Sequence, residues 1–292
     1  MAERIRILSV PYDCGLHNIR MGRGPIELLG YGLTDRIRDA DHDVAITTID
    51  HGLPVPSENT VAFQMHELLG NAVRDCRAEG AFPLILSGNC NYAAIGAVTG
   101  LGVEETGVLW FDAHGESETP ETTRSAFLDG MGLAMLTGGC WTQRLGDMPG
   151  FSPLDPQRAV LVGARDLSEA EQAYIGDRNI GRVTVEDICT TGAAALTPEL
   201  DRLGALGVRR LYVHVDADVY DPDNVGHANH FSATAGTGLT AEELTGCLSA
   251  IYDAIPIQAA AITAYDPSVD PSGRMRGTLT ALAVHLSGLG RI

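Results

Sequence analysis

Two short acidic segments combine residue types and spacings that suit the binding of metal ions. The first reads DAHGE at residues 112–116, and the second reads HVDAD at residues 214–218. Their ionisable side chains lie two residues apart, so those of one segment face the same side of an extended chain. Carboxylates that are buried together are costly unless a cation neutralises them. Carboxylates with imidazole suit manganese, iron, zinc or nickel.

Each acidic segment follows a run of apolar residues that predicts a buried strand. Such runs, bounded by Gly, Pro or Asp, are typical of parallel strands covered on both faces. They lie at Ile5–Val10, Val44–Ile49, Pro83–Leu86, Gly107–Phe111, Ala159–Val162, Arg210–Val215 and Ile257–Thr263. Helical spacing predicts helices at Val61–Arg77, Pro198–Leu206, Ala241–Ala254 and Thr278–Leu289.

Two of these helices have recognisable starts. Thr197 is the predicted N-cap of the helix that begins with Pro198, and Thr240 with Glu243 predicts a capping box. The alternation of strands and helices predicts an α/β fold with one doubly wound parallel sheet over residues 1–292. Ligands of such sheets bind beyond the carboxyl ends of the strands, which favours the polar loops 115–139 and 221–238.

The composition excludes several other functions. The 292 residues carry 38 acids against 20 bases, a net charge of −18, which disfavours a nucleic-acid partner and gives no reason to expect an anionic membrane. No apolar run reaches the roughly 18 residues that cross a bilayer. Without a secretory leader, and with six dispersed cysteines, a cytoplasmic protein with reduced thiols is expected.

Motifs spread over most of the chain resemble those of the ureohydrolase family, the arginases, agmatinases and formimidoylglutamases. Besides the two acidic segments they are VPYD at 10–13, MGRGP at 21–25, GNCN at 88–91, LDGM at 128–131 and YDP at 265–267. The resemblance implies a single arginase-like domain of three layers, α/β/α, with a mainly parallel sheet. It also implies hydrolysis of a guanidino or formimino C–N bond by a hydroxide that bridges two metal ions, usually manganese.

The metal ligands carry over from the family with two replacements. Asp112 and Asp216 match the aspartates that bridge both ions, and His114 and Asp218 complete the set for one ion. The other ion has Cys90 where the family has histidine and Glu116 where it has aspartate. A thiolate is softer than imidazole and must lose a proton to bind, while Glu116 is longer by one methylene. This ion is therefore expected to be held more weakly.

Further departures fall on residues around the substrate. Glu118 replaces a frequent Asn, Asp129 replaces the histidine that arginases and agmatinases use in proton transfer, and Ala264 replaces the glutamate that grips the guanidinium. The changes at Cys90 and Asp129 resemble a subgroup that includes hydroxyarginine hydrolases of antibiotic pathways. Glu116 and Glu118 depart even from that subgroup.

The remaining candidates have roles assigned by their chemistry. Asp218 is expected to relay a proton to the leaving amine, and Asp129, His227 or His230 to stand in for the missing proton-transfer histidine. The predicted substrate-binding residues are Glu118 and Asp266 for a cationic group and Arg124 for a carboxylate.

The resulting hypothesis is a metal-dependent hydrolase of a guanidine, hydroxyguanidine or related amidine, expected to act as a homo-oligomer. Two manganese ions are the expected cofactors, with nickel, zinc and iron as alternatives. A second hypothesis is an altered homologue that holds one metal or none and serves binding or assembly. Metal content separates the two, since about two ions per chain favour the hydrolase.

Overall fold

The central element of the structure is a twisted parallel sheet. The computed structural model describes residues 4–53, 57–231 and 237–290. Within them, eight strands pair in parallel in the order β4-β1-β5-β10-β9-β6-β7-β8. Their bounds are β1 Arg4–Val10, β4 Asp43–Thr48, β5 Phe82–Ser87, β6 Thr106–Phe111, β7 Ala159–Val162, β8 Gly181–Val183, β9 Arg210–Asp216 and β10 Ile257–Thr263. A separate antiparallel pair joins β2 Tyr12–Asp13 to β3 Leu16–His17.

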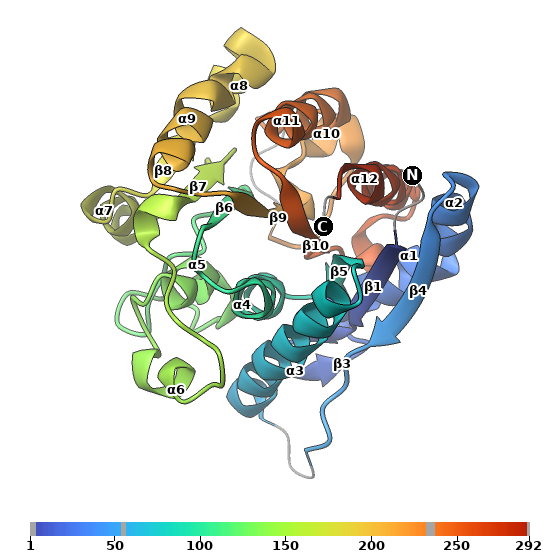
Figure 1. The fold of residues 1–292 in the computed structure, drawn as a ribbon, viewed down its shortest axis with the longest axis horizontal. Helices are drawn as coiled ribbons and strands as arrows, with labels where there is room; N and C mark the ends of the chain where they lie inside the picture. Colours follow the sequence, from blue (N-terminus) through green and yellow to red (C-terminus); the bar gives the residue numbers. More distant parts are fainter. Residues whose placement is uncertain (1–3, 54–56, 232–236, 291–292) are drawn as a thin grey trace.

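Helices cover both faces of this sheet (Figure 1). One layer holds α3 Glu58–Ala78, α4 Cys90–Leu101, α5 Gly132–Leu136, α6 Thr142–Gly146 and α7 Glu169–Asp177. The other holds α1 Gly24–Gly30, α2 Leu33–Asp39, α8 Val185–Thr191, α9 Thr197–Ala205, α10 Pro222–Val225, α11 Ala241–Ala254 and α12 Arg274–Leu289. The predicted three-layer α/β/α architecture is thus confirmed. None of the described helices is long and apolar enough to cross a membrane.

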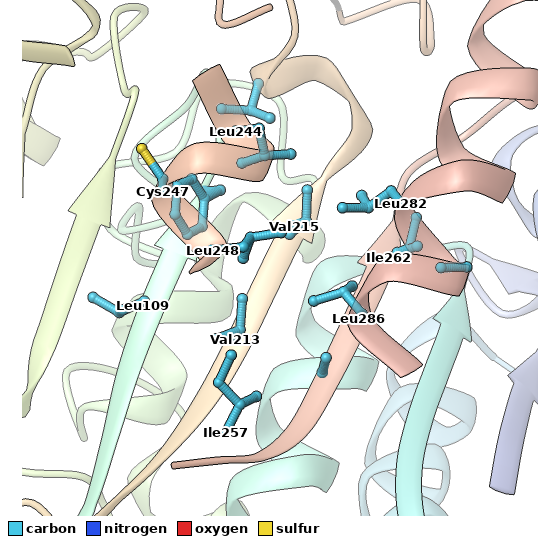
Figure 2. Close-up of a cluster of buried hydrophobic side chains, with 14 of the residues drawn as sticks. Leu109, Val213, Val215, Leu244, Cys247, Leu248, Ile257, Ile262, Leu282 and Leu286 are labelled. Atoms are coloured by element: carbon cyan, nitrogen blue, oxygen red, sulfur yellow. The ribbon is translucent and has the colours of Figure 1, made fainter. Parts of the chain in front are cut away.

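The two faces of the sheet have separate hydrophobic cores. Side chains alternate across each strand, so Leu84 and Leu86 of β5 pack into one core and Ile85 into the other. Figure 2 shows part of the first core, where α11 and α12 lay their leucines over β9 and β10. Full burial of one such side chain stabilises the fold by about 1.5–3 kcal/mol. The sheet is therefore a rigid platform for residues at its ends.

All seven predicted strands are present, with ends that differ by one residue or none. The additional β8 has only three residues, too few for a periodic signal. The helix α4 also went unpredicted, because all twelve of its residues are buried and its sequence has no polar face.

Three predicted helix starts need correction and one is confirmed. Helix α3 begins at Glu58 rather than Val61. Thr197 is not an N-cap: Leu196 takes that position, and Thr197 with Pro198 forms the start of the helix itself. Helix α12 begins at Arg274 rather than Thr278. The capping box of Thr240 is present, with the Thr240 hydroxyl accepting from the Glu243 amide.

Candidate metal centre

The predicted ligands meet where neighbouring strands end. Strands β5, β10, β9 and β6 are adjacent in that order and parallel. Cys90 follows β5, Asp112 follows β6 and Asp216 ends β9. Because parallel strands end at one edge of a sheet, residues far apart in the chain lie together there.

The ligand atoms form two groups that share one aspartate. Cys90 Sγ and carboxylate oxygens of Asp112 and Asp216 lie within 4.8 Å of one another. Asp112, His114 and Glu116 meet the same limit in a second group. Asp112 thus has the position of a bridging ligand. Glu116, which the resemblance assigned to the ion of Cys90, is grouped here with His114.

Asp218 joins the cluster through His114. The Nδ1 atom of His114 lies 3.3 Å from Asp218 Oδ2 and 3.4 Å from Asp112 Oδ1. The structure therefore brings all six predicted ligand residues into one cluster.

The backbone turns within both acidic segments instead of staying extended throughout, which corrects the prediction; in the second segment the turn follows Asp216, the last residue of β9. Asp112 Oδ1 accepts a hydrogen bond of 2.8 Å from the amide of His114, and Glu116 has a left-handed φ of 50°. Asp216 Oδ1 likewise accepts from the amide of Asp218 at 2.8 Å, at the start of a 3-10 turn. Convergence of the side chains therefore depends on these turns.

The electrostatics of the cluster show an excess of buried negative groups. Burial and the neighbouring carboxylates raise the pKa values of Asp112, Glu116 and Asp216. Burial also acts to raise the pKa of Asp218, but the charge of His114 holds it at about 2. Burial lowers the pKa of His114, yet the charge of Asp218 outweighs it and the net pKa is raised. One histidine thus faces four buried acids.

A divalent cation fits these residues. The Oε2 atom of Glu116 is buried and has no hydrogen-bond partner among the described residues, although an unpaired buried carboxylate oxygen is costly. Oxygen, imidazole nitrogen and thiolate sulfur together suit manganese, iron, zinc or nickel. The residues that would hold the ions are Cys90, Asp112, His114, Glu116, Asp216 and Asp218.

Two residues that sequence analysis missed orient the aspartates. The indole Nε1 of Trp110 donates to Asp112 Oδ2 at 2.8 Å, and Asn229 Nδ2 donates to Asp218 Oδ2 at 3.2 Å. Trp110 precedes the acidic segment by two residues, the same spacing that defined the segment, so that signal was present. Asn229 had no local signal, because it belongs to a distant loop.

Asp129 lies beside Cys90, but its oxygens are already engaged. Its carboxylate accepts hydrogen bonds from the backbone amides of Cys90 and Asn91, at 2.9 and 2.7 Å. It also accepts from the side-chain amides of Asn89 and Asn91, both at 2.8 Å. These contacts fix the first turn of α4, and with it the position of Cys90.

A cavity of about 340 Å³ opens over the cluster. This volume is within the range of small-molecule sites. The rings of Phe127 and Phe231 stack at its wall with centroids 5.2 Å apart. Its other lining residues are Met21, His114, Glu116, Glu118, Ser125, Asp129, Gly130, Asp166, Leu167, Ser168, Glu171, Asp216, Asp218, Asn229 and Ala264.

The structure places some predicted substrate residues outside this lining. Glu118 lines the cavity and is half-buried. Arg124 and His227 are exposed and do not line it. Asp266 is buried and lies 3.8 Å from the exposed His230, and neither lines the cavity. Of the predicted loop 221–238, residues 232–236 lie outside the described residues.

The parallel α/β fold and the ligand cluster at its carboxyl edge define a metal-dependent hydrolase of the ureohydrolase class. Residues 3–287 match the sequence model of the arginase family. The chain therefore belongs to the arginase family and is a metal-dependent amidinohydrolase.

Individual arginases are similar to this chain, in sequence and in structure, over nearly its whole length. The arginase of Bacillus subtilis (strain 168) is 28% identical over 300 residues, which cover 99% of each protein. The crystal structure of Bacillus subtilis arginase superimposes with a TM-score of 0.85 at 26% identity, covering 98% of this chain and 99% of that one. The native structure of Bacillus caldovelox arginase gives a TM-score of 0.86 at 26% identity, covering 98% of both chains.

Proposed function

We propose that this protein hydrolyses a C–N bond of a cationic guanidine or related amidine, with two manganese ions as cofactors. The observation that carries the proposal is the pair of ligand groups that share Asp112 below the cavity. When bound, the ions would supply Lewis-acid activation of water, lowering its pKa toward about 7. The complete ligand set disfavours the alternative of a homologue without metal.

Residues of the chain are proposed to transfer protons and to position the ligands. Asp218 is the proposed proton acceptor, because it faces the cavity and Asn229 fixes one of its oxygens. From Asp218 the proton passes to the leaving amine. We assign Asp129 a positioning role, since four N–H donors occupy its oxygens. His227 and His230 are exposed, so a proton reaching them would exchange with solvent directly.

The cavity wall supports a cationic substrate without a carboxylate. Glu118 and Asp166 line it and have no side-chain partner among the described residues. His114, a proposed ligand, is the single basic side chain in the described lining. A carboxylate would therefore face acids and no guanidinium, because Arg124 lies outside the lining. The ring pair of Phe127 and Phe231 offers an apolar surface for the substrate body.

A metal and activity measurement tests this proposal. Mass spectrometry should find about two divalent ions per chain, and urea or ammonia release should be screened with guanidines that differ at the far end. We expect faster turnover of amine-ended or neutral compounds than of carboxylate-ended ones. Glu118→Gln should raise KM for the cationic compounds more than it lowers kcat. Less than one ion per chain with no C–N hydrolysis would favour the binding or assembly alternative.

The cellular setting is also a proposal. The cysteines of the described chain are unpaired, which is compatible with a cytoplasmic protein. A homo-oligomer is proposed from the membership of the arginase family alone. Sedimentation of the purified protein measures that state directly.

A further inference from the structure

A row of buried polar side chains leads from the sheet interior to Cys90. The Tyr212 hydroxyl lies 2.7 Å from His214 Nδ1, and His214 Nε2 lies 3.1 Å from Thr263 Oγ1. Thr263 Oγ1 in turn lies 3.1 Å from Cys90 Sγ. All four side chains are fully enclosed, with 0–1% exposed. Water therefore has no access to these polar atoms, and protein groups must meet their hydrogen bonds. Outside the row, the Val215 carbonyl lies 3.4 Å from Thr263 Oγ1, and Asp216 Oδ2 accepts from Cys90 Sγ at 3.0 Å.

The direction of these hydrogen bonds follows from the end of the row. The only partner that the described residues offer to the Tyr212 hydroxyl is His214 Nδ1. If Nδ1 carried the proton and donated, the Tyr212 O–H would be buried without an acceptor, at a cost of about 1–3 kcal/mol. Tyr212 therefore donates to Nδ1. A neutral imidazole then carries its single proton on Nε2.

This tautomer determines what Thr263 does. His214 Nε2–H donates to Thr263 Oγ1, which leaves the Thr263 hydroxyl proton to be donated elsewhere. Its remaining acceptors are Cys90 Sγ at 3.1 Å and the carbonyl of Val215 at 3.4 Å. The sulfur is the nearer one in spite of its larger radius. The hydroxyl of Thr263 is thus directed at the sulfur of Cys90.

We propose that Tyr212, His214 and Thr263 form a directed hydrogen-bond chain that positions and tunes the sulfur of Cys90 as a metal ligand. The inference rests on the proposed role of Cys90 in the metal centre. A donor on the sulfur fixes its orientation and reduces the charge that it gives to a metal, and such outer contacts tune metal sites. Thr263 is a positioning residue, because it acts through Cys90.

Trp110 ties this chain to a second ligand. Its ring stacks on His214, with centroids 4.1 Å apart and planes 29° apart. Its Nε1 atom donates to Asp112 Oδ2 at 2.8 Å. The stack prevents rotation of the imidazole, so one rigid layer under the site orients both Cys90 and the shared Asp112. The side chain of Cys90, at the position where the family has histidine, is thereby held in one orientation.

The tautomer of His214 tests the chain in the metal-free protein, independently of any activity. Long-range proton–nitrogen NMR on histidine-labelled protein, with the signals assigned through His214→Gln, should show Nε2 protonated and Nδ1 unprotonated. Tyr212→Phe should remove this preference. The opposite tautomer in the wild-type protein would overturn the inference, and would leave the proposed hydrolase function untouched.

Cobalt substitution tests the effect on the metal. Cobalt bound by a thiolate has a sulfur-to-metal charge-transfer band, which Cys90→Ala should abolish. Thr263→Val should move this band to lower energy and weaken cobalt binding by about 10–100-fold. Thr263→Ser, which keeps the hydroxyl, should restore both. The control is Thr280→Val, which removes a buried hydroxyl that is bonded to the Arg276 carbonyl and does not line the cavity.

The outcomes separate the two proposals. A band that neither Thr263→Val nor Tyr212→Phe moves would refute the directed chain while Cys90 remains a ligand. A wild-type protein without the band would refute both the Cys90 ligand and this inference. Hydrolysis measured on the manganese-loaded protein tests the proposed hydrolase function independently of the hydrogen-bond chain.

Discussion

Lowering the pH should destabilise the metal-free protein through one buried histidine. His66 of α3 is completely buried, and its Nε2 atom pairs with Asn91 Oδ1 at 2.9 Å. Its Nδ1 atom has no hydrogen-bond partner among the described residues. Burial, with a smaller contribution from the charge of Arg144, lowers the pKa of His66 to about 4. The fold therefore holds this ring neutral at a pH where an exposed ring is charged.

The sign and size of the effect follow from this shift. The unfolded chain binds the proton near its ordinary pKa of about 6.5, and the folded chain only near 4. The stability contributed by the neutral ring is complete above about pH 6.5 and is lost as the pH falls toward 4. On going from about pH 8 to pH 5, the free energy of unfolding falls only below about pH 6.5, that is, over roughly 1.5 pH units. Each unit is worth about 1.4 kcal/mol, so the protein loses about 2 kcal/mol of stability.

The assay compares wild-type protein with His66→Gln by urea unfolding in the presence of a chelator. Gln cannot take up the proton, so the stability difference between the two proteins should shrink by about 2 kcal/mol from pH 8 to pH 5. The contributions of other titrating groups cancel in this difference. Thr280→Val, which removes a buried group that does not titrate, should differ from wild type equally at both pH values. A difference for His66→Gln that is flat over this range would refute the reasoning.

Three further predictions concern the metal centre. Asp112→Ala should lose more bound metal than Cys90→Ala in mass spectrometry with the fold retained, because Asp112 belongs to both ligand groups; equal loss would contradict the sharing. Glu116→Asp should raise metal occupancy in equilibrium dialysis, since the shorter side chain is the family's ligand there, and unchanged occupancy would mean that Glu116 does not ligate. Metal binding at neutral pH should release protons, because burial raises the pKa of the Cys90 thiol well above its ordinary value and the thiol must lose its proton to bind. Calorimetry in buffers of different ionisation enthalpy measures that release, and an enthalpy independent of the buffer would contradict it.

The residue types that give the site its chemistry can be recognised from short stretches of sequence. Asp112, His114 and Glu116 stand next to an apolar run, as do Asp216 and Asp218, and the strand signal of such runs needs no knowledge of distant contacts. The carboxyl ends of parallel strands bind ligands for geometric reasons, so position along the chain predicted that these five ionisable side chains converge, whereas Cys90 was assigned from the family resemblance.

The order of the strands was decided only by the tertiary structure. Strand β10, last in the chain, inserts between β5 and β9 and brings Thr263 against Cys90 and His214. Local periodicity does not encode this order, because any buried strand fits any interior position of the sheet. The hydrogen-bond chain below Cys90 was therefore invisible in the sequence.

Contacts between distant segments also explain why the sequence did not predict the surroundings of Asp129 and Glu116. Asp129 was expected near the reacting groups, but its four N–H partners include the start of a helix that the sequence did not reveal. The grouping of Glu116 with His114 depends on a left-handed residue in a bent segment. Residue types at strand ends determine which chemistry is available, because they are fixed by local sequence. Which side chain engages which partner is decided by packing between distant segments, where distances of a few tenths of an ångström separate a ligand from a bystander.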